Sequence, residues 1–202
     1  MNNLLNLNDL SFSYDSEREI LENFDLCINA GDKVLLKGSN GTGKSTLLKI
    51  LSHYIENDSL SYTLKFHEKT HFADIRQHLA FIPDEVFAFE DLTAIQNIKF
   101  FQLFWQLDNL YYDKVVEICS LFNIGHSLED KVSSFSLGMK NKLFLALNLA
   151  YNAELYLLDE PFNALDKDAQ VSLINWINDS QAAYIIATHL LPPDLMQHLK
   201  LT

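Results

Sequence analysis

The spacing of apolar residues predicts strands toward both ends of the chain. Apolar side chains occupy every second position over Leu10–Tyr14 and Phe24–Ile28, which is the period of a half-buried strand. Continuous apolar runs are typical of strands that a parallel sheet buries on both faces. Short apolar runs predict five more strands, at 33–37, 61–66, 79–82, 155–158 and 183–187.

The middle of the chain has the three- and four-residue spacing of helices. This spacing extends over Thr93–Leu107 and Tyr111–Phe122, and Gly125 follows as a stop signal. The segment 139–150 is strongly apolar-periodic and is also expected to be helical. Other helices are expected over 45–51, from a cap at Asp166 to about Asn178, and after Pro192.

Composition and charge narrow the class of protein. The chain has 202 residues, nearly half of them apolar, which is enough for one sizeable domain. A net charge of −12 argues against nucleic acid or an anionic membrane face as a direct partner. We find no apolar run of membrane-spanning length and no secretory signal. Cys27 and Cys119 fit no metal or redox spacing, so we expect two buried thiols in a cytoplasmic protein.

A glycine-rich loop lies between the strand predicted at 33–37 and the helix predicted at 45–51. Its sequence matches the phosphate-binding pattern and is Gly38-Ser39-Asn40-Gly41-Thr42-Gly43-Lys44-Ser45-Thr46. The glycines let backbone N–H groups approach phosphate oxygens, and the helix N-terminus adds partial positive charge. Lys44 is placed to reach the β- and γ-phosphates of a nucleotide, and the Ser45 hydroxyl can ligate Mg²⁺. A plain glycine turn is the weaker alternative.

The element order and this loop together predict an α/β fold with a phosphate-loop NTPase core. N-terminal antiparallel strands are followed by a parallel sheet with flanking helices. The helical stretch interrupts the strands of that core, so we expect it to form an inserted helical subdomain. We expect one domain, with a nucleotide-binding core at about 1–85 and 154–202 and the helical subdomain at about 86–153.

Two carboxylates follow the buried run at 155–158. In phosphate-loop enzymes an acid at this strand end completes the Mg²⁺ site, which makes Asp159 a candidate metal ligand. Glu160 can point elsewhere and act as the general base for the attacking water. A strand that ends in a solvated acidic turn is the alternative.

The segment Ser134–Lys140, Ser-Phe-Ser-Leu-Gly-Met-Lys, resembles the signature sequence of ATP-binding cassette (ABC) ATPases, whose usual form is Leu-Ser-Gly-Gly-Gln. In that family the segment begins a helix that faces the γ-phosphate of ATP bound by the opposing subunit. The resemblance implies that Ser136 and Gly138 make this contact. A serine hydroxyl, a glycine N–H and a helix N-terminus would together form a compact anion site.

The resemblance covers essentially the whole chain and implies roles for three more residues. Tyr14 lies where the family has an aromatic residue that stacks on adenine, although a plain strand tyrosine is an alternative. Asp166 ends the segment Asn163–Asp166, which resembles the D-loop that crosses the family's dimer interface. His189 follows a buried strand, where the family has its switch histidine, and a structural histidine is the alternative.

The family resemblance also implies an activity and partners. It implies an ATP-hydrolysing subunit, with Mg²⁺, that powers a separate membrane permease. Two such chains, as a homodimer or a pair with another cassette, would enclose ATP, with Lys44, Glu160 and His189 as catalytic residues. The chain would then be cytoplasmic and attached to the inner membrane face through its partner, without direct membrane insertion and without a nucleic-acid partner.

Two motifs of the chain depart from the ABC pattern. Asp84 follows the strand at 79–82, where the family has a glutamine that touches Mg²⁺ and the attacking water. An aspartate can ligate Mg²⁺, so Asp84 is a further candidate metal ligand, while weakened hydrolysis and a neutral replacement stay open. Leu137 and Met139 replace a glycine and the glutamine of the signature, a form that resembles ABC-2-type exporters. The compact chain resembles haem-exporter subunits.

Aromatic residues are concentrated at 87–92 and 100–105. In the ABC family this region receives a coupling helix of the membrane subunit, but aromatics also fill the core of a small helical subdomain. Phe87 and Phe89 are the better interface candidates. Two other functional classes stay open: a soluble ABC-type ATPase that acts as a switch or assembly scaffold, and a non-hydrolysing cassette paired with an active one.

Overall fold

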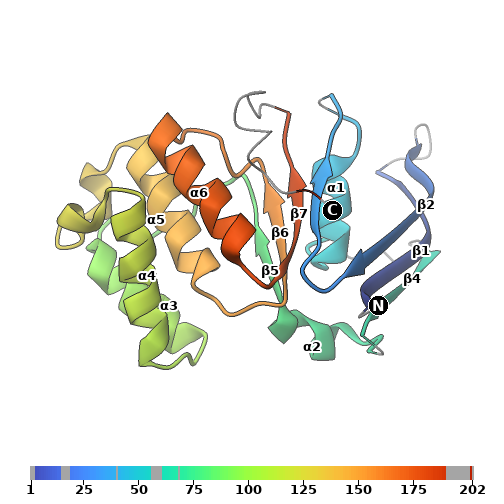
Figure 1. Cartoon of the computed structure of the whole chain (residues 1–202), viewed down its shortest axis with the longest axis horizontal. Coiled ribbons are helices and arrows are strands. Elements are labelled where there is room, and N and C mark those ends of the chain that lie inside the picture. The colour runs from blue at the N-terminus through green and yellow to red at the C-terminus, as the bar shows by residue number, and fades with distance from the viewer. Residues whose placement is uncertain are drawn as a thin grey trace.

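Two sheets share the strands of this chain, and a helix lies between them (Figure 1). The computed structural model describes residues 3–14, 19–39, 41–55, 61–67, 69–189 and 201. The antiparallel sheet has the order β2-β1-β4, with bounds Glu19–Asn29, Asn3–Ser13 and Ser61–Phe66. The parallel sheet has the order β3-β7-β6-β5, with bounds Lys33–Leu36, Ala183–Ala187, Leu155–Asp159 and Leu79–Ile82. The expected α/β class, with antiparallel N-terminal strands, is confirmed.

The helices lie on both faces of the parallel sheet. Helix α1 (Lys44–Leu51) lies between the two sheets, and α6 (Lys167–Asp179) and α5 (Leu137–Leu149) cover the opposite face (Figure 1). Helices α3 (Ala94–Phe104) and α4 (Asn109–Leu121) pack outside α5. The short helices are α2 (Phe72–Ile75) and 3₁₀ turns at Arg76–His78, Gly125–Ser127 and Val132–Ser134. None of the described helices is both long and apolar enough to cross a bilayer.

Alternation along the parallel strands divides the apolar interior into two cores. Successive side chains of a strand point to opposite faces of the sheet. In β6, Leu155 and Leu157 therefore join the core around α1 and the antiparallel sheet, whereas Tyr156 and Leu158 join the core of α3–α6. Every residue of β6 and β7 is buried, which explains why these strands have continuous apolar sequences.

Helix α5 confirms the helix predicted at 139–150, but it is buried on nearly all sides and not along a periodic apolar stripe. Its residues from Lys142 to Leu147 are all buried. Helices α3 and α4 and the sheet contact α5, and its most exposed residue is Leu137 in the first turn, at 67%. Lys142 tolerates this burial because its ammonium pairs with the Asp166 carboxylate.

Helices α3 and α4 end at non-glycine residues in the left-handed region. Asn123 has φ 58°, and the Ile124 N–H donates to the Cys119 carbonyl at 2.9 Å in a Schellman turn. Asn123, and not the predicted Gly125, therefore stops α4. Gln106 (φ 56°) terminates α3 in the same way.

The two cysteines differ in burial, although both were expected to be buried. Cys119 is buried as expected, but Cys27 is exposed on β2, so the prediction of a second buried thiol was wrong. The helix predicted after Pro192 lies outside the described residues, as does Asn40 of the glycine-rich loop.

Candidate functional site

The glycine-rich loop joins β3 to α1, as the sequence predicts. Gly43 has φ +88°, and a Cβ built there would lie 2.9 Å from Ile20 Cγ2, so only glycine fits without a shift of β2. The Lys44 ammonium lies over the loop and donates to the carbonyls of Gly38 at 2.7 Å and Ser39 at 3.1 Å. The loop thus presents a helix N-terminus and one ammonium at the same point, a suitable arrangement for polyphosphate.

Thr42 closes this loop. Its hydroxyl donates to the Ser39 carbonyl at 2.9 Å, and a Cβ on Gly38 would lie 2.6 Å from the same hydroxyl. Gly41 also has a positive φ, +80°, but a Cβ there would meet nothing within 4 Å. Glycine is therefore favoured at the three positions for different reasons: close packing at Gly38, backbone conformation at Gly41, and both at Gly43.

Ser45 and Asp159 meet next to the loop. The Ser45 hydroxyl donates to Asp159 Oδ1 at 2.9 Å, across 114 residues of sequence. Asp159 is 5% exposed at the end of β6. Burial raises the pKa of its carboxyl, the Ser45 hydrogen bond opposes that shift, and the charges of Asp84 and Glu160 add to it. A hydroxyl and a carboxylate oxygen at this separation are the hard oxygen ligands that Mg²⁺ takes.

Glu160 and His189 form a hydrogen-bonded pair. The Glu160 Oε1 lies 2.6 Å from His189 Nδ1 and accepts from the His189 backbone N–H at 3.1 Å, while Oε2 accepts from the Thr188 hydroxyl at 2.8 Å. The pair forms because β6 and β7 are neighbours and both end at this edge of the sheet. Glu160 itself has φ 49°, a left-handed conformation that is uncommon for a residue other than glycine. Sequence reasoning did not give Thr188 a role, since a lone threonine after a strand carries no signal.

Tyr14 lies at the end of β1 beside α1. Its ring is 60% exposed and meets Phe12 edge-on at 4.8 Å between ring centroids. Its hydroxyl lies 3.2 Å from the Thr46 hydroxyl, which connects Tyr14 to the helix after the phosphate loop. An exposed ring at this position is accessible to a base, so stacking on adenine stays a prediction with a suitable geometry.

Asp84 is held by the D-loop segment. The Asn163 side-chain amide donates to Asp84 Oδ1 at 3.2 Å, and the Asn163 carbonyl accepts from the Asn141 side-chain amide at 3.0 Å. These bonds connect the strand end of β5, the D-loop and helix α5. Among the described residues, no three His, Cys, Asp or Glu side chains are arranged to hold a metal ion. Asp84 as a metal ligand stays a prediction.

The signature segment forms the start of α5, and the contacts of Ser136 and Gly138 are with α5 and the D-loop segment. The Ser136 hydroxyl caps the helix by accepting from the Met139 N–H at 3.2 Å, and Ser136 is exposed. A Cβ on Gly138 would lie 2.9 Å from the Ala164 carbonyl, so the close packing of α5 on the D-loop requires glycine. Asp166 caps α6 through the Ala169 N–H at 3.0 Å and pairs with Lys142, which gives it a structural role in this chain.

The aromatic segment divides into a buried and an exposed part. Phe101 is 8% exposed and belongs to the core of α3–α6, whereas Phe87 and Phe104 are 54% and 66% exposed. Phe89 is half-buried between them, 4.5 Å from the Phe100 ring centroid. Both expected uses of these aromatics, as core and as surface, are therefore present.

Known proteins are similar to this chain in sequence and in architecture. The family model described as ABC transporter matches residues 21–163. YdbJ, an ABC transporter ATP-binding protein of Bacillus subtilis (strain 168), is 31% identical over 180 residues, which cover 86% of this chain and 58% of YdbJ. The lantibiotic transport ATP-binding protein SrtF of Streptococcus pyogenes is 31% identical over 163 residues, which cover 81% of this chain and 69% of SrtF. The chain thus spans little more than half of YdbJ.

A solved structure extends the likeness to three dimensions. The ATP-binding subunit of an ABC transporter superposes with a TM-score of 0.80 and 27% identity, covering 93% of this chain and 80% of that one. The matched family region includes the phosphate loop, the signature segment and the two strand-end acids. Sequence and fold agree, and the chain belongs to the ABC transporter family.

Proposed function

We propose that this chain is the ATP-binding and ATP-hydrolysing subunit of an ABC transporter. The observation that carries the proposal is the convergence of the phosphate loop, Asp159 and the Glu160–His189 pair at one edge of the parallel sheet. Ligands of open α/β sheets bind at this carboxyl edge, where the helix N-terminus after β3 also lies. A glutamate held by the Thr188 hydroxyl and by the backbone and ring of His189 supports a hydrolysing cassette over a non-hydrolysing one.

The residues present also fit Mg²⁺ as the cofactor. Ser45 Oγ and Asp159 Oδ1 would hold it, and Asp84 lies near enough to affect the pKa of Asp159. Bound Mg²⁺ supplies charge neutralisation at the β- and γ-phosphate oxygens. Since the pKa of Asp159 is raised, its carboxyl needs a higher pH than an ordinary aspartate to be fully ionised and ready for this role.

The chain's own residues would then orient ATP and the attacking water. Lys44 would exchange its contacts with the Gly38 and Ser39 carbonyls for phosphate oxygens. Glu160 would accept a proton from the water as it attacks the γ-phosphorus. A carboxylate at His189 Nδ1 favours the tautomer with its proton on that atom, which fixes the ring and directs Nε2 away from Glu160.

The complete site would require a second cassette. Within this chain, Ser136 and Gly138 contact their own helix and the D-loop rather than the phosphate loop. We propose that they act on ATP held by a second chain, either another copy or a paired cassette. The exposed side of Ser136 and Leu137, which is 67% exposed, is the surface available for this pairing.

We further propose that 86–153 acts as a helical subdomain that docks on a separate membrane permease, which would attach the chain to the membrane. Exposed Phe87 beside half-buried Phe89 gives an apolar surface for such a partner. The Ser-Leu-Gly-Met-Lys signature favours an exporter. Phe87→Ser should reduce recovery of an integral membrane protein in detergent pull-downs, while Tyr54→Ser, which removes an exposed ring elsewhere, should not.

The first test is steady-state ATPase activity of the unmodified chain beside Glu160→Gln. If Glu160 is the general base, the variant should bind ATP normally and lose roughly 10²–10⁴-fold in turnover. Glu129→Gln makes the same chemical change at an exposed position and should leave turnover unaltered. Undiminished hydrolysis by Glu160→Gln would remove Glu160 from the mechanism.

Light scattering on the same two proteins tests pairing. In the presence of ATP, Glu160→Gln should accumulate a dimer because ATP is bound but not consumed. A monomer under saturating ATP would mean that a different cassette chain completes the site. Absence of both ATP binding and turnover in the unmodified chain would contradict the proposed function itself.

A further inference from the structure

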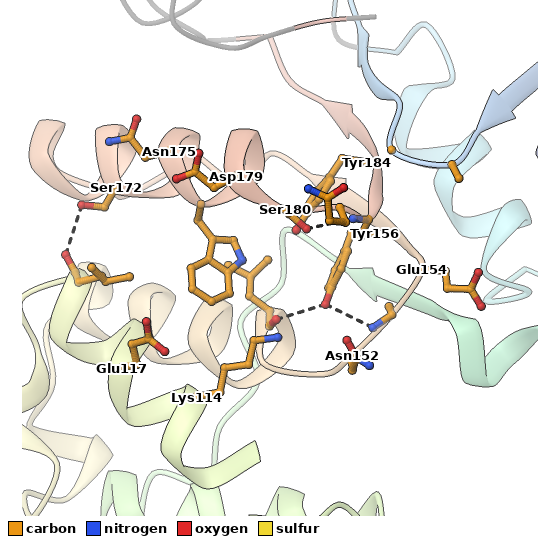
Figure 2. A pocket seen from close by; sticks show the side chains of 18 of the residues that line it. Lys114, Glu117, Asn152, Glu154, Tyr156, Ser172, Asn175, Asp179, Ser180 and Tyr184 are labelled. Carbon is orange, nitrogen blue, oxygen red and sulfur yellow. Dashed lines mark hydrogen bonds between the residues drawn. The ribbon is translucent and has the colours of Figure 1, made fainter. Parts of the chain in front are cut away.

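Figure 2 shows a cavity of about 730 Å³, whose lining includes none of the residues of the nucleotide site. Glu154, Ala182 and Gly31 line it, and each comes directly or closely before a parallel strand. Because parallel strands share one orientation, these residues lie at the opposite edge of the sheet from the phosphate loop. The volume falls in the range of small-molecule sites.

The two long walls of the cavity come from α4 and α6. Lys114 and Glu117 project from α4, and Asp179 from α6 (Figure 2). Trp176 of α6 also lines the cavity. The Ser172 hydroxyl on α6 donates to the carbonyl of Leu121, the last residue of α4, at 3.3 Å and joins the two helices at one side. A ligand in this cavity would therefore touch α4 on one side and α6 on the other.

Lys114 is a half-buried lysine in the wall of the cavity. Its ammonium lies 5.6 Å from the centroid of the half-buried Trp176 ring. It forms no hydrogen bond or ion pair with any residue in the described part of the chain. Burial lowers the pKa of Lys114, and the charge of Glu117 only partly opposes this shift. A half-buried ammonium with three free donors is a seat for one anionic group.

The surroundings of Lys114 limit what the anion can be. The Trp176 indole next to the ammonium offers a flat apolar face, on which an aromatic ring can lie while its charged group reaches Lys114. Glu117 and Asp179 are exposed at the rim, where water screens them, but their repulsion grows with the charge of the ligand. This argues against nucleotides and other polyanions.

From this arrangement we infer that the cavity between α4 and α6 is a binding site for a small planar aromatic monoanion, such as an aryl carboxylate. The carboxylate pairs with Lys114 and the ring lies against Trp176. None of these groups takes part in the nucleotide site, so the inference does not depend on the proposed function.

The test uses Trp176 as its reporter, because the chain has only two tryptophans, Trp105 and Trp176. In a Trp105→Phe variant, 3-iodobenzoate should quench Trp176 fluorescence to saturation with one site per chain. Neutral 3-iodobenzamide should bind at least about tenfold more weakly. Lys114→Met should weaken binding of the benzoate by about the same factor, whereas Lys99→Met, which removes an exposed lysine from α3, should not.

Three further arms keep the result unambiguous. Calorimetry on the unmodified chain repeats the titration, in case Trp105→Phe is poorly folded. In Trp176→Phe, Trp105 should show no saturable quenching. Saturating ADP should leave the benzoate affinity unchanged. The inference is overturned if quenching does not saturate, if Lys114→Met binds as tightly as the parent, or if ADP displaces the benzoate, which would place the anion in the phosphate loop.

Discussion

Replacement of Asn97 by alanine should destabilise the protein much more than replacement of an exposed asparagine. Asn97 is fully buried in α3 and holds the segment that carries the exposed aromatics. Its Oδ1 accepts from the Phe89 N–H at 2.8 Å, and its Nδ2 donates to the carbonyls of Phe89 and Thr93, both at 3.0 Å. At about 1 kcal/mol for each bond, the loss is about 3 kcal/mol. For a chain of this size, this corresponds to a fall in Tm of about 6–12 °C.

Thermal unfolding followed by circular dichroism measures this fall in Tm. Asn109→Ala removes the same amide from an exposed position and should change Tm by no more than about 2 °C. Asn97→Leu separates the loss of the side-chain hydrogen bonds from the loss of side-chain volume, since leucine fills the volume but leaves the Phe89 N–H unpaired. The Phe89 and Thr93 carbonyls would still accept from the backbone N–H groups of Leu92 and residue 97. If Asn97→Leu restores wild-type stability, or if Asn97→Ala unfolds within about 2 °C of wild type, the hydrogen bonds do not stabilise the segment as argued.

Three other outcomes follow from the geometry. Gly43→Ala should reduce both ATP affinity and Tm more than Gly41→Ala, because both backbones have positive φ but only a Cβ on Gly43 would strike Ile20; equal losses in nucleotide titrations and thermal scans would contradict this. Cys27 should react with Ellman's reagent at once and Cys119 only after unfolding, because burial raises the pKa of Cys119 to about 12; rapid titration of both thiols in the native chain would be inconsistent with the fold. Asp84→Gln should move the acid limb of the Mg²⁺-dependent ATPase profile to lower pH, because it removes a charge that raises the pKa of Asp159, whereas exposed Glu85→Gln should not; an unmoved limb would show that Asp84 does not act on Asp159.

Much of the candidate site could be predicted from the sequence because its signals are local. The glycine pattern and the lysine and serine after it need only a strand before and a helix after, and both can be recognised from apolar spacing. The acids after Leu155–Leu158 were predicted for the same reason, since a buried strand that ends in two carboxylates is a local feature. The cap of α6 at Asp166 was also predicted correctly, because aspartate is a preferred residue at the start of a helix.

Other features depend on which distant segments become neighbours. Glu160 contacts Thr188 and His189 only because β6 pairs with β7. The order of strands in a sheet cannot be predicted from the sequence of either strand alone. Asn97 looks like an ordinary polar residue in a helix until the loop at 89–93 folds over it. The cavity at Lys114 exists because α4 and α6 lie side by side without filling the space between them.

The sequence by itself therefore indicated the family through its motifs and the types of most elements through apolar periodicity, and it predicted the residues that would bind a nucleotide. The tertiary structure decided which polar groups are paired, that α5 is buried on almost every side, and that Cys27 is exposed. The physical reason is that burial and hydrogen-bond partners are properties of the packed chain. A residue's own neighbours in sequence fix its local conformation, but the free energy of its side chain depends on segments that are distant in sequence and close only in the folded protein.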